Sequence, residues 1–128
     1  QWLVPTKVTG GGIEEAVVVQ VAAGINHSMA LTATGGLYSW GKGDSGQLGH
    51  GDKENVAVPR VVGGIDGAVV GMAGSAFHSL AITGEGRVLA FGDWGCLGLG
   101  AEVGEALVPT AIDGITMGEG DEGKEGKE

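Results

Sequence analysis

Cysteine, proline and aromatic residues are scarce in this sequence of 128 residues, which has one cysteine, Cys96, 3 prolines and an aromatic content of 5%. A single cysteine excludes an internal disulfide and a metal site built from several cysteines, and it fits a reducing compartment such as the cytoplasm or the nucleus. No apolar run approaches the ~18 residues of a membrane-spanning helix, and no secretory signal pattern is visible. We therefore expect an intracellular chain with no membrane contact.

Basic residues are also few. The chain has 7 lysines and arginines against 16 acidic residues, which gives a net charge of −9. Binding to nucleic acid or to an anionic membrane calls for clustered lysine and arginine. We therefore expect no direct contact with nucleic acid.

Residues that often bind metals or phosphates do not fall into the known patterns here. Asp44, Asp52 and Asp93 lie in glycine-rich segments, but none of them has the spacing of a calcium loop. Residues 41–46 (GKGDSG) satisfy G-x-G-x-x-G, yet the residues that follow make a poor helix start, and a dinucleotide site needs a helix there. The sequence therefore predicts no cofactor and no metal ion.

Glycine, by contrast, is abundant, with 28 residues, and most glycines recur at fixed offsets. The segment HSMALT at 27–32 returns 51 residues later as HSLAIT at 78–83. The loop sequence GKGDSGQLGHG at 41–51 then aligns with GDWGCLGLG at 92–100 after a deletion of two residues. Val-Pro pairs stand at 4–5, 58–59 and 108–109. Internal similarity at this period indicates a repeat architecture.

Each repeat contains four short strand candidates and shows no helical periodicity. Glycines at 35–36 and around Glu85 predict hairpin turns between the second and third strands. A proline removes a donor from the hydrogen-bond ladder, so the strands that contain Pro59 and Pro109 are expected at sheet edges. The candidates are residues 16–22, 27–32, 37–40 and 56–62 in the first unit, and 68–72, 78–83, 88–91 and 107–112 in the second.

These patterns predict an all-β fold of two consecutive four-stranded antiparallel blades of a β-propeller. The expected organisation is the end of a preceding repeat with its linker at 1–15, a first full repeat at 16–66, a second, degenerate repeat at 67–115, and an acidic, disordered tail at 116–128. We interpret the chain as a fragment of a longer protein.

The histidines invite a catalytic interpretation. His27 and His78 recur at one position of successive repeats, whereas a catalytic site is normally built once, so each is expected to make a structural hydrogen bond inside its own blade. His50 aligns with Leu99 and is expected to be a loop residue. Cys96 has no nearby histidine and is expected to be a packed side chain. The sequence therefore predicts no catalytic residue.

The first unit closely resembles the repeat of the regulator of chromosome condensation family, in segments 22–32 (AAGINHSMALT), 37–41 (LYSWG) and 46–51 (GQLGHG) and at Pro59. The resemblance covers residues 2–115 and implies a seven-bladed propeller, of which this chain holds an open part. Two blades cannot close a ring, so the isolated chain is expected to self-associate. The repeat positions assigned to structure are Gly24, His27, Gly41, Gly46, Leu48, Gly49, Gly51, Pro59, Gly74, His78, Gly92, Gly95, Leu97, Gly98, Gly100 and Pro109.

The resemblance also implies a protein-interaction scaffold whose loops contact partners at the mouths of the ring. Family members include guanine-nucleotide exchange factors for the Ran GTPase and parts of HECT-type ubiquitin ligases, so these functions are the alternatives. The light-sensing branch of the family has clustered tryptophans where this chain has residues 25–26 and 76–77, and a kelch-type propeller fits the motif at 47–49 poorly. Trp94, an aromatic residue in a loop, is the candidate partner contact.

Overall fold

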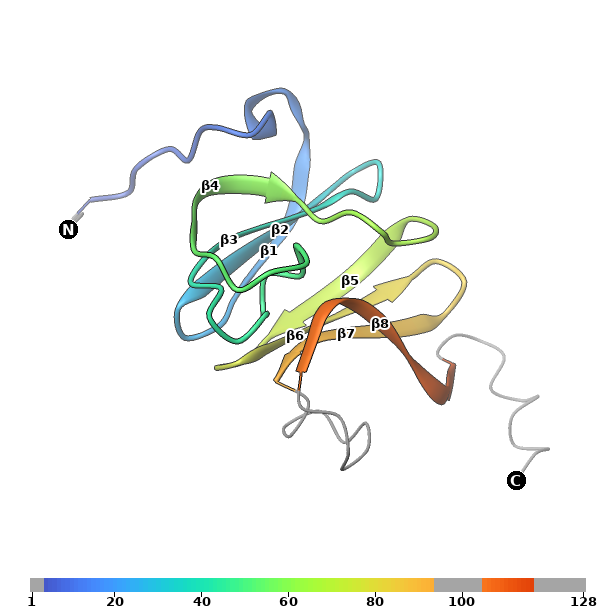
Figure 1. Cartoon of the computed structure of the whole chain (residues 1–128). Coiled ribbons are helices and arrows are strands. Elements are labelled where there is room, and N and C mark those ends of the chain that lie inside the picture. The colour runs from blue at the N-terminus through green and yellow to red at the C-terminus, as the bar shows by residue number, and fades with distance from the viewer. Residues whose placement is uncertain (1–3, 94–104, 117–128) are drawn as a thin grey trace.

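The computed structural model describes residues 4–93 and 105–116, and in these ranges eight strands form two four-stranded antiparallel sheets (Figure 1). Sheet A has the strand order β1-β2-β3-β4 and sheet B the order β5-β6-β7-β8, which confirms the predicted all-β architecture. Within these ranges no helix is long and apolar enough to span a membrane. The elements are η1, a 3-10 helix (Ile13–Glu15), β1 (Val18–Ala23), β2 (His27–Thr32), β3 (Leu37–Gly41), β4 (Val56–Val61), β5 (Val69–Gly74), β6 (His78–Thr83), β7 (Arg87–Asp93) and β8 (Glu105–Thr116).

The two sheets repeat each other in register. His27 of β2 pairs with Gly41 of β3, and His78 of β6 pairs with Gly92 of β7. An irregularity interrupts the first ladder of each sheet at the equivalent place, early in β1 and early in β5. The repeat seen in the sequence is therefore a repeat of backbone structure.

The strands that contain proline lie at the edges of the sheets, as predicted. Pro59 is in β4 and Pro109 is in β8, and each of these strands pairs with one neighbour only. Strand β8 is longer than the predicted segment 107–112, since it continues to Thr116, the first residue of the expected tail. Residues 117–128 lie outside the described residues, so the disorder of the tail stays a prediction.

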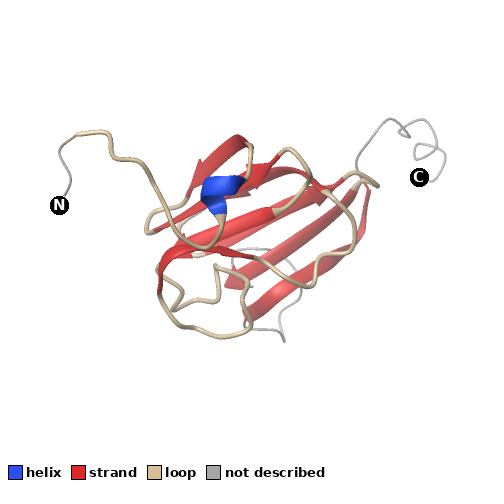
Figure 2. Cartoon of the chain, turned by 90° about the horizontal axis from the view of Figure 1, so that it is seen from above, coloured by secondary structure: helices blue, strands red, loops and turns tan. Residues whose placement is uncertain are grey.

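The apolar core lies between the facing sides of the two sheets, which lie next to each other in Figure 2. Alternation along β2 turns Met29 and Leu31 toward sheet B, and both side chains are buried. Sheet B presents the small side chains of Ala81 and Ser79 on this side, which lets the two sheets approach closely. Burial of apolar surface contributes roughly 25 cal/mol per Å². The interface between the two sheets, which we call the seam, therefore stabilises the pair. The buried cluster comprises Met29, Leu31, Leu37, Val62, Val69, Ala81 and Phe91.

The long loop at residues 42–55, which follows β3 of sheet A, reaches across to sheet B. A Cβ atom added to Gly49 would lie 2.8 Å from Cδ2 of Phe91, so the glycine backbone rests on the ring. The backbone N–H of Gly51 donates to the carbonyl of Leu107 at 2.9 Å. The ammonium of Lys53 lies 2.7 Å from the carboxylate of Glu105. This loop therefore joins sheet A to strands β7 and β8 of sheet B.

Gly49→Val tests the contact between the loop and Phe91. Gly49 has a φ of +77°, where a β-branched residue is strained, and its Cβ would also press on the ring. We expect a loss of about 2 to 4 kcal/mol in the free energy of unfolding, from backbone strain together with overpacking. Chemical denaturation followed by circular dichroism measures the change.

Lys53→Ala is the control from the same loop. Its ion pair is about half exposed, and such pairs contribute at most about 1 kcal/mol. Equal melting temperatures for Gly49→Val and Lys53→Ala would contradict the assigned role of the loop.

Candidate functional site

His27 is buried at the seam, and its hydrogen bond crosses from one sheet to the other. Its Nε2 lies 2.9 Å from Oγ of Ser79, whose hydroxyl donates to the carbonyl of Gln47 at 2.8 Å. Because the serine proton is used on Gln47, Nε2 of His27 must carry the proton that it shares with Ser79. The prediction of a bond inside each blade is therefore wrong for His27. The sequence could not reveal a partner that lies 52 residues away.

The remaining ring nitrogen of His27, Nδ1, is buried and has no hydrogen-bond partner. Gly24 lies against this side of the ring, and a Cβ at Gly24 would collide with the imidazole and with the carbonyl of Ser75. Burial lowers the pKa of His27, and the nearby His78 lowers it further. The lowered pKa favours the neutral ring, and the backbone of Gly24 packs tightly against its Nδ1 side.

A second histidine and serine pair fixes the loop to its own sheet. Ser39, which is fully buried, donates its hydroxyl proton to the carbonyl of Leu48 at 2.7 Å and lies 3.0 Å from Nε2 of His50. Burial lowers the pKa of His50, and this effect outweighs the opposing hydrogen bond to the Ser39 backbone. A nucleophilic serine needs its proton directed at a basic nitrogen, whereas this proton is directed at a carbonyl. The pair therefore holds the loop, which is where the sequence placed His50.

The G-x-G-x-x-G segment does not form a phosphate cradle. The backbone N–H of Gly43 donates to Oδ1 of Asn55 at 3.0 Å, and that of Ser45 donates to Oε1 of Gln47 at 2.8 Å. The N–H of Gly46 donates to the carbonyl of Gly43 at 3.0 Å. A phosphate loop keeps such groups free for the anion. These donors are instead used to shape the turn.

The other assigned repeat positions divide between the sheets and the loops. Leu48 and Pro59 are buried, and Gly74 approaches the backbone of Ala23 and Gly24. Among residues 4–93 and 105–116 no group of acidic, histidine or cysteine side chains could hold a metal ion. A positive φ is found at Gly41, Gly46, Gly49, Gly51 and Gly92. The assigned positions Trp94, Gly95, Cys96, Leu97, Gly98 and Gly100 lie outside the described residues.

Two exposed apolar side chains stand at neighbouring hairpin tips. Ile25, between β1 and β2, is 71% exposed, and Phe77, between β5 and β6, is 49% exposed. The two hairpins are in contact, because Gly24 of the first closely approaches the carbonyl of Ser75 in the second. We call Ile25 and Phe77 the tip patch. Sequence reasoning treated both residues as departures from a light-sensing pattern and did not recognise a surface.

His27, which is buried, and His50, which is half-buried, make stability depend on pH. Both His27 and His50 have a pKa lowered from the ~6.5 of an unfolded histidine, so below that pH the unfolded chain binds more protons than the folded one. We expect full stability above about pH 7 and a falling free energy of unfolding as the pH drops through about 6.5. Denaturation with urea between about pH 8 and 5.5 measures this, above the range in which carboxylates titrate.

Substitution separates the two contributions to this pH dependence. His27→Gln and His50→Gln should each make the free energy of unfolding less dependent on pH, because each removes one of the two groups. A wild-type stability that rises as the pH falls would contradict the burial of neutral histidines.

Curated relatives of the chain include much longer proteins. The E3 ubiquitin-protein ligase HERC2 of Homo sapiens is 44% identical over 120 residues, which cover 88% of this chain and 2% of the ligase. Protein RCC2 of Homo sapiens is 43% identical over 89 residues, which cover 67% of this chain and 17% of RCC2. The chain therefore spans a small part of the length of these relatives.

The solved structure of Prp20p from Saccharomyces cerevisiae is similar in fold. It matches with a TM-score of 0.72 at 22% sequence identity, over 89% of this chain and 34% of Prp20p. Prp20p is described together with its binding properties to Gsp1p and histones. At this level of identity the likeness establishes the architecture of propeller blades.

The family assignment rests on the repeat itself. Two family models, both described as the regulator of chromosome condensation (RCC1) repeat, match residues 18–47 and 34–82. Together they extend from β1 of sheet A into β6 of sheet B, and they include His27, Gly49 and His78. The chain therefore belongs to the regulator of chromosome condensation (RCC1) repeat family, and its two sheets are blades of a β-propeller.

Proposed function

We propose that this chain is a protein-binding scaffold and that the tip patch, Ile25 and Phe77, is its main partner contact. The proposal is supported by a contrast: the histidine and serine side chains that could react lie in the interior, whereas large apolar side chains are exposed. His27, Ser79 and Ser39 make hydrogen bonds in the interior, whereas the side chains of the tip patch are exposed to solvent. Exposed aromatic and aliphatic side chains on loops held by a rigid sheet are typical of interface hot spots.

Charged side chains at the start of the long loop would form the polar rim of an interface centred on the tip patch. Lys42 follows β3, and its backbone N–H donates to the carbonyl of Asn26 in the first hairpin at 2.9 Å, so the start of the long loop lies at the same end of the sheet. The ammonium of Lys42 lies 3.6 Å from the carboxylate of Asp44, and both side chains are about half exposed. An apolar centre with charged groups at its margin is the usual arrangement of a protein interface.

Two alternatives follow from the relatives. Prp20p is described with binding to Gsp1p, which supports guanine-nucleotide exchange on a Ran-type GTPase as a second candidate. HERC2 is a ubiquitin ligase, and a chain that matches 2% of it would serve as a binding region and not as the ligase centre. In both cases the blades would supply a surface. For each we propose an intracellular location, in the cytoplasm or the nucleus, which the single cysteine fits.

Two measurements on the chain and a Ran-type GTPase distinguish simple binding from nucleotide exchange. A Ran-type GTPase loaded with a fluorescent guanine nucleotide is titrated with the chain, and nucleotide release and complex formation are followed in parallel. A scaffold binds the GTPase or a histone dimer and leaves the release rate unchanged. Accelerated release that saturates with the chain would replace the scaffold by the exchange factor.

The double variant Ile25→Ser and Phe77→Ser tests the tip patch. We expect its affinity for whichever of these two proteins binds the wild type to fall at least about 10-fold, since hot-spot truncations cost more than 1 kcal/mol each. Isothermal titration calorimetry gives the dissociation constants. Because both side chains are exposed, the melting temperature should remain unchanged.

The matched control is the double variant Val61→Ser and Val70→Ser. Each of these valines is 56% exposed and lies in a strand away from the hairpin tips. This control should bind as the wild type does. Equal weakening by both double variants, or no weakening by the first, would contradict the assignment of the tip patch.

A further inference from the structure

The connection between the two sheets, residues 62–68, contains an aspartate that is followed directly by a glycine, Asp66 and Gly67. Both residues are exposed and lie outside any strand. A Cβ atom added to Gly67, whose φ is +97°, would meet no atom within 4 Å. Exposed loops with few contacts open locally at little cost in free energy. The Asp-Gly pair therefore lies in a part of the surface where the backbone can change conformation.

Neither residue of the pair is held by a hydrogen bond within residues 4–93 and 105–116. There the backbone N–H of Gly67 donates to no acceptor, and the carboxylate of Asp66 accepts from no donor. The residues on either side are fixed. Ile65 packs against the apolar core, and the buried Val69 donates its backbone N–H to the carbonyl of Gly35 at 3.0 Å. The pair is thus an unbonded segment between two fixed points.

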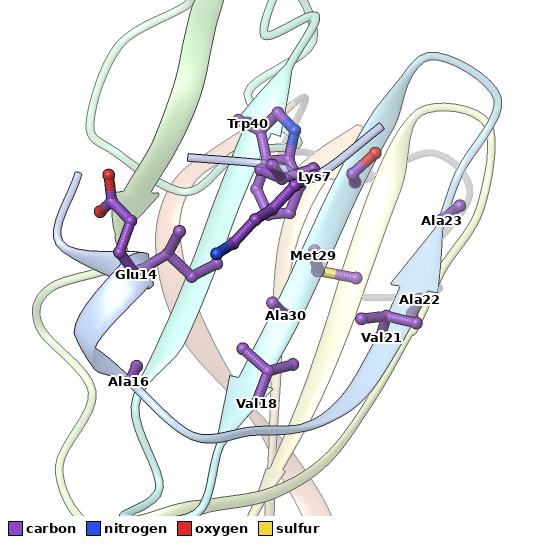
Figure 3. Close-up of a pocket in the computed structure, with 13 residues that line it drawn as sticks. Lys7, Glu14, Ala16, Val18, Val21, Ala22, Ala23, Met29, Ala30 and Trp40 are labelled. Carbon is purple, nitrogen blue, oxygen red and sulfur yellow. The ribbon is translucent and has the colours of Figure 1, made fainter. Parts of the chain in front are cut away.

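The corresponding connection of the first unit is held by hydrogen bonds. Ile13 is buried and follows a glycine with a positive φ, as the isoleucine before Asp66 does, and the next residue is Glu14 of η1 (Figure 3). The carboxylate of Glu14 accepts a hydrogen bond from the backbone N–H of Gly10 at 2.9 Å. The backbone N–H of Glu15 donates to the carbonyl three residues earlier at 3.1 Å. The two groups that are unbonded in the second connection are therefore both engaged in the first.

An aspartate in the setting of Asp66 can cyclise onto the backbone. The backbone nitrogen of Gly67 attacks Cγ of Asp66, the N–Cγ bond forms, and the carboxyl hydroxyl leaves with the amide proton as water. Water then opens the resulting five-membered succinimide. Cleavage of the new N–Cγ bond restores aspartate, whereas cleavage between the nitrogen and the main-chain carbonyl gives isoaspartate, in which the backbone runs through Cγ. The attack needs an unbonded N–H, local rotation and a following residue without a side chain, and all three are present here.

We propose that Asp66 is a modification site at which isoaspartate forms in the folded chain, and that the product is a substrate for an isoaspartyl methyltransferase that uses S-adenosylmethionine. Such an enzyme transfers the methyl group from the sulfonium to the free carboxylate of the isoaspartate and releases S-adenosylhomocysteine. The exposure of the connection gives the enzyme access. The proposal is independent of partner binding, because the connection enters β5 at the end opposite to the hairpin that carries Phe77.

The fold can accommodate the modified residue. Isoaspartate adds one carbon atom to the backbone between Ile65 and Val69, the two fixed points. The open space around Gly67 takes up this detour, so both fixed residues keep their contacts. We therefore expect the modified chain to stay folded, with the circular dichroism spectrum of the unmodified chain.

Ageing of the folded chain at neutral pH tests the proposal. Trypsin cleaves after Arg60 and Arg87, and Asp66 is the one aspartate in the resulting peptide, residues 61–87. Isoaspartyl methyltransferase with labelled S-adenosylmethionine measures isoaspartate in the intact folded chain and in its digest, and fragmentation by electron transfer locates the residue. A parallel sample is aged in guanidinium chloride. We expect isoaspartate at Asp66 to form in the folded chain within about 2-fold of the rate in the unfolded chain, because the local opening of such a loop costs almost no free energy.

Two matched variants identify the source of the label. Asp66→Glu keeps the charge but would have to close a six-membered ring, which forms much more slowly, so the label in peptide 61–87 should disappear. Asp44→Glu is the control. Asp44 is also exposed, but it is followed by Ser45, whose backbone N–H donates to Oε1 of Gln47 at 2.8 Å. This control should leave the label in peptide 61–87 unchanged.

The other Asp-Gly pair of the chain, at 113–114, reports on protection by folding, because it lies in strand β8. There we expect less isoaspartate in the folded chain than in the unfolded one. Folding that slows the reaction at Asp66 as strongly as at Asp113, or label in peptide 61–87 that persists in Asp66→Glu, would overturn the proposal. Isoaspartate at residue 66 that is methylated only after digestion would overturn it equally.

Discussion

The packing of the two sheets depends on one hydroxyl group, that of Ser79, which accepts a hydrogen bond from Nε2 of His27 and donates one to the carbonyl of Gln47. These two hydrogen bonds join sheet B to strand β2 of sheet A and to the long loop that follows β3. Because the three residues are buried, loss of any partner would leave a polar group without compensation in an apolar seam. The bonds add little net energy beyond that of apolar burial, but they fix the position of one sheet on the other.

The chain contains two histidine and serine pairs at hydrogen-bond distance, His27 with Ser79 and Ser39 with His50. In each pair the serine hydroxyl donates to a backbone carbonyl. Removal of the imidazole from water, complete for His27 and partial for His50, lowers the pKa of both rings. These side chains therefore stabilise the fold through their hydrogen bonds. The surface that we propose for partner contact is therefore the apolar tip patch, Ile25 and Phe77, and not one of these pairs.

Local sequence patterns predicted much of the fold, because strand alternation, glycine turns and proline at sheet edges act within a few residues. The period between His27 and His78 predicted two similar sheets, and the register confirms it. The partner of His27 and the contact of Gly49 with Phe91 could not be predicted, since they depend on how one sheet packs on the next. The tip patch was missed for a similar reason, because only the packing of the two sheets brings the hairpin of Ile25 next to the hairpin of Phe77.

In this arrangement His27 is neutral, and its proton lies on Nε2 and is directed at Ser79. Long-range ¹H–¹⁵N correlation spectra of the histidine side chains, recorded at neutral pH, test it most directly. We expect an unprotonated Nδ1 and a protonated Nε2 for His27, and a change in these signals in Ser79→Ala. A His27 ring protonated on Nδ1, or one that carries a positive charge at neutral pH, would contradict it.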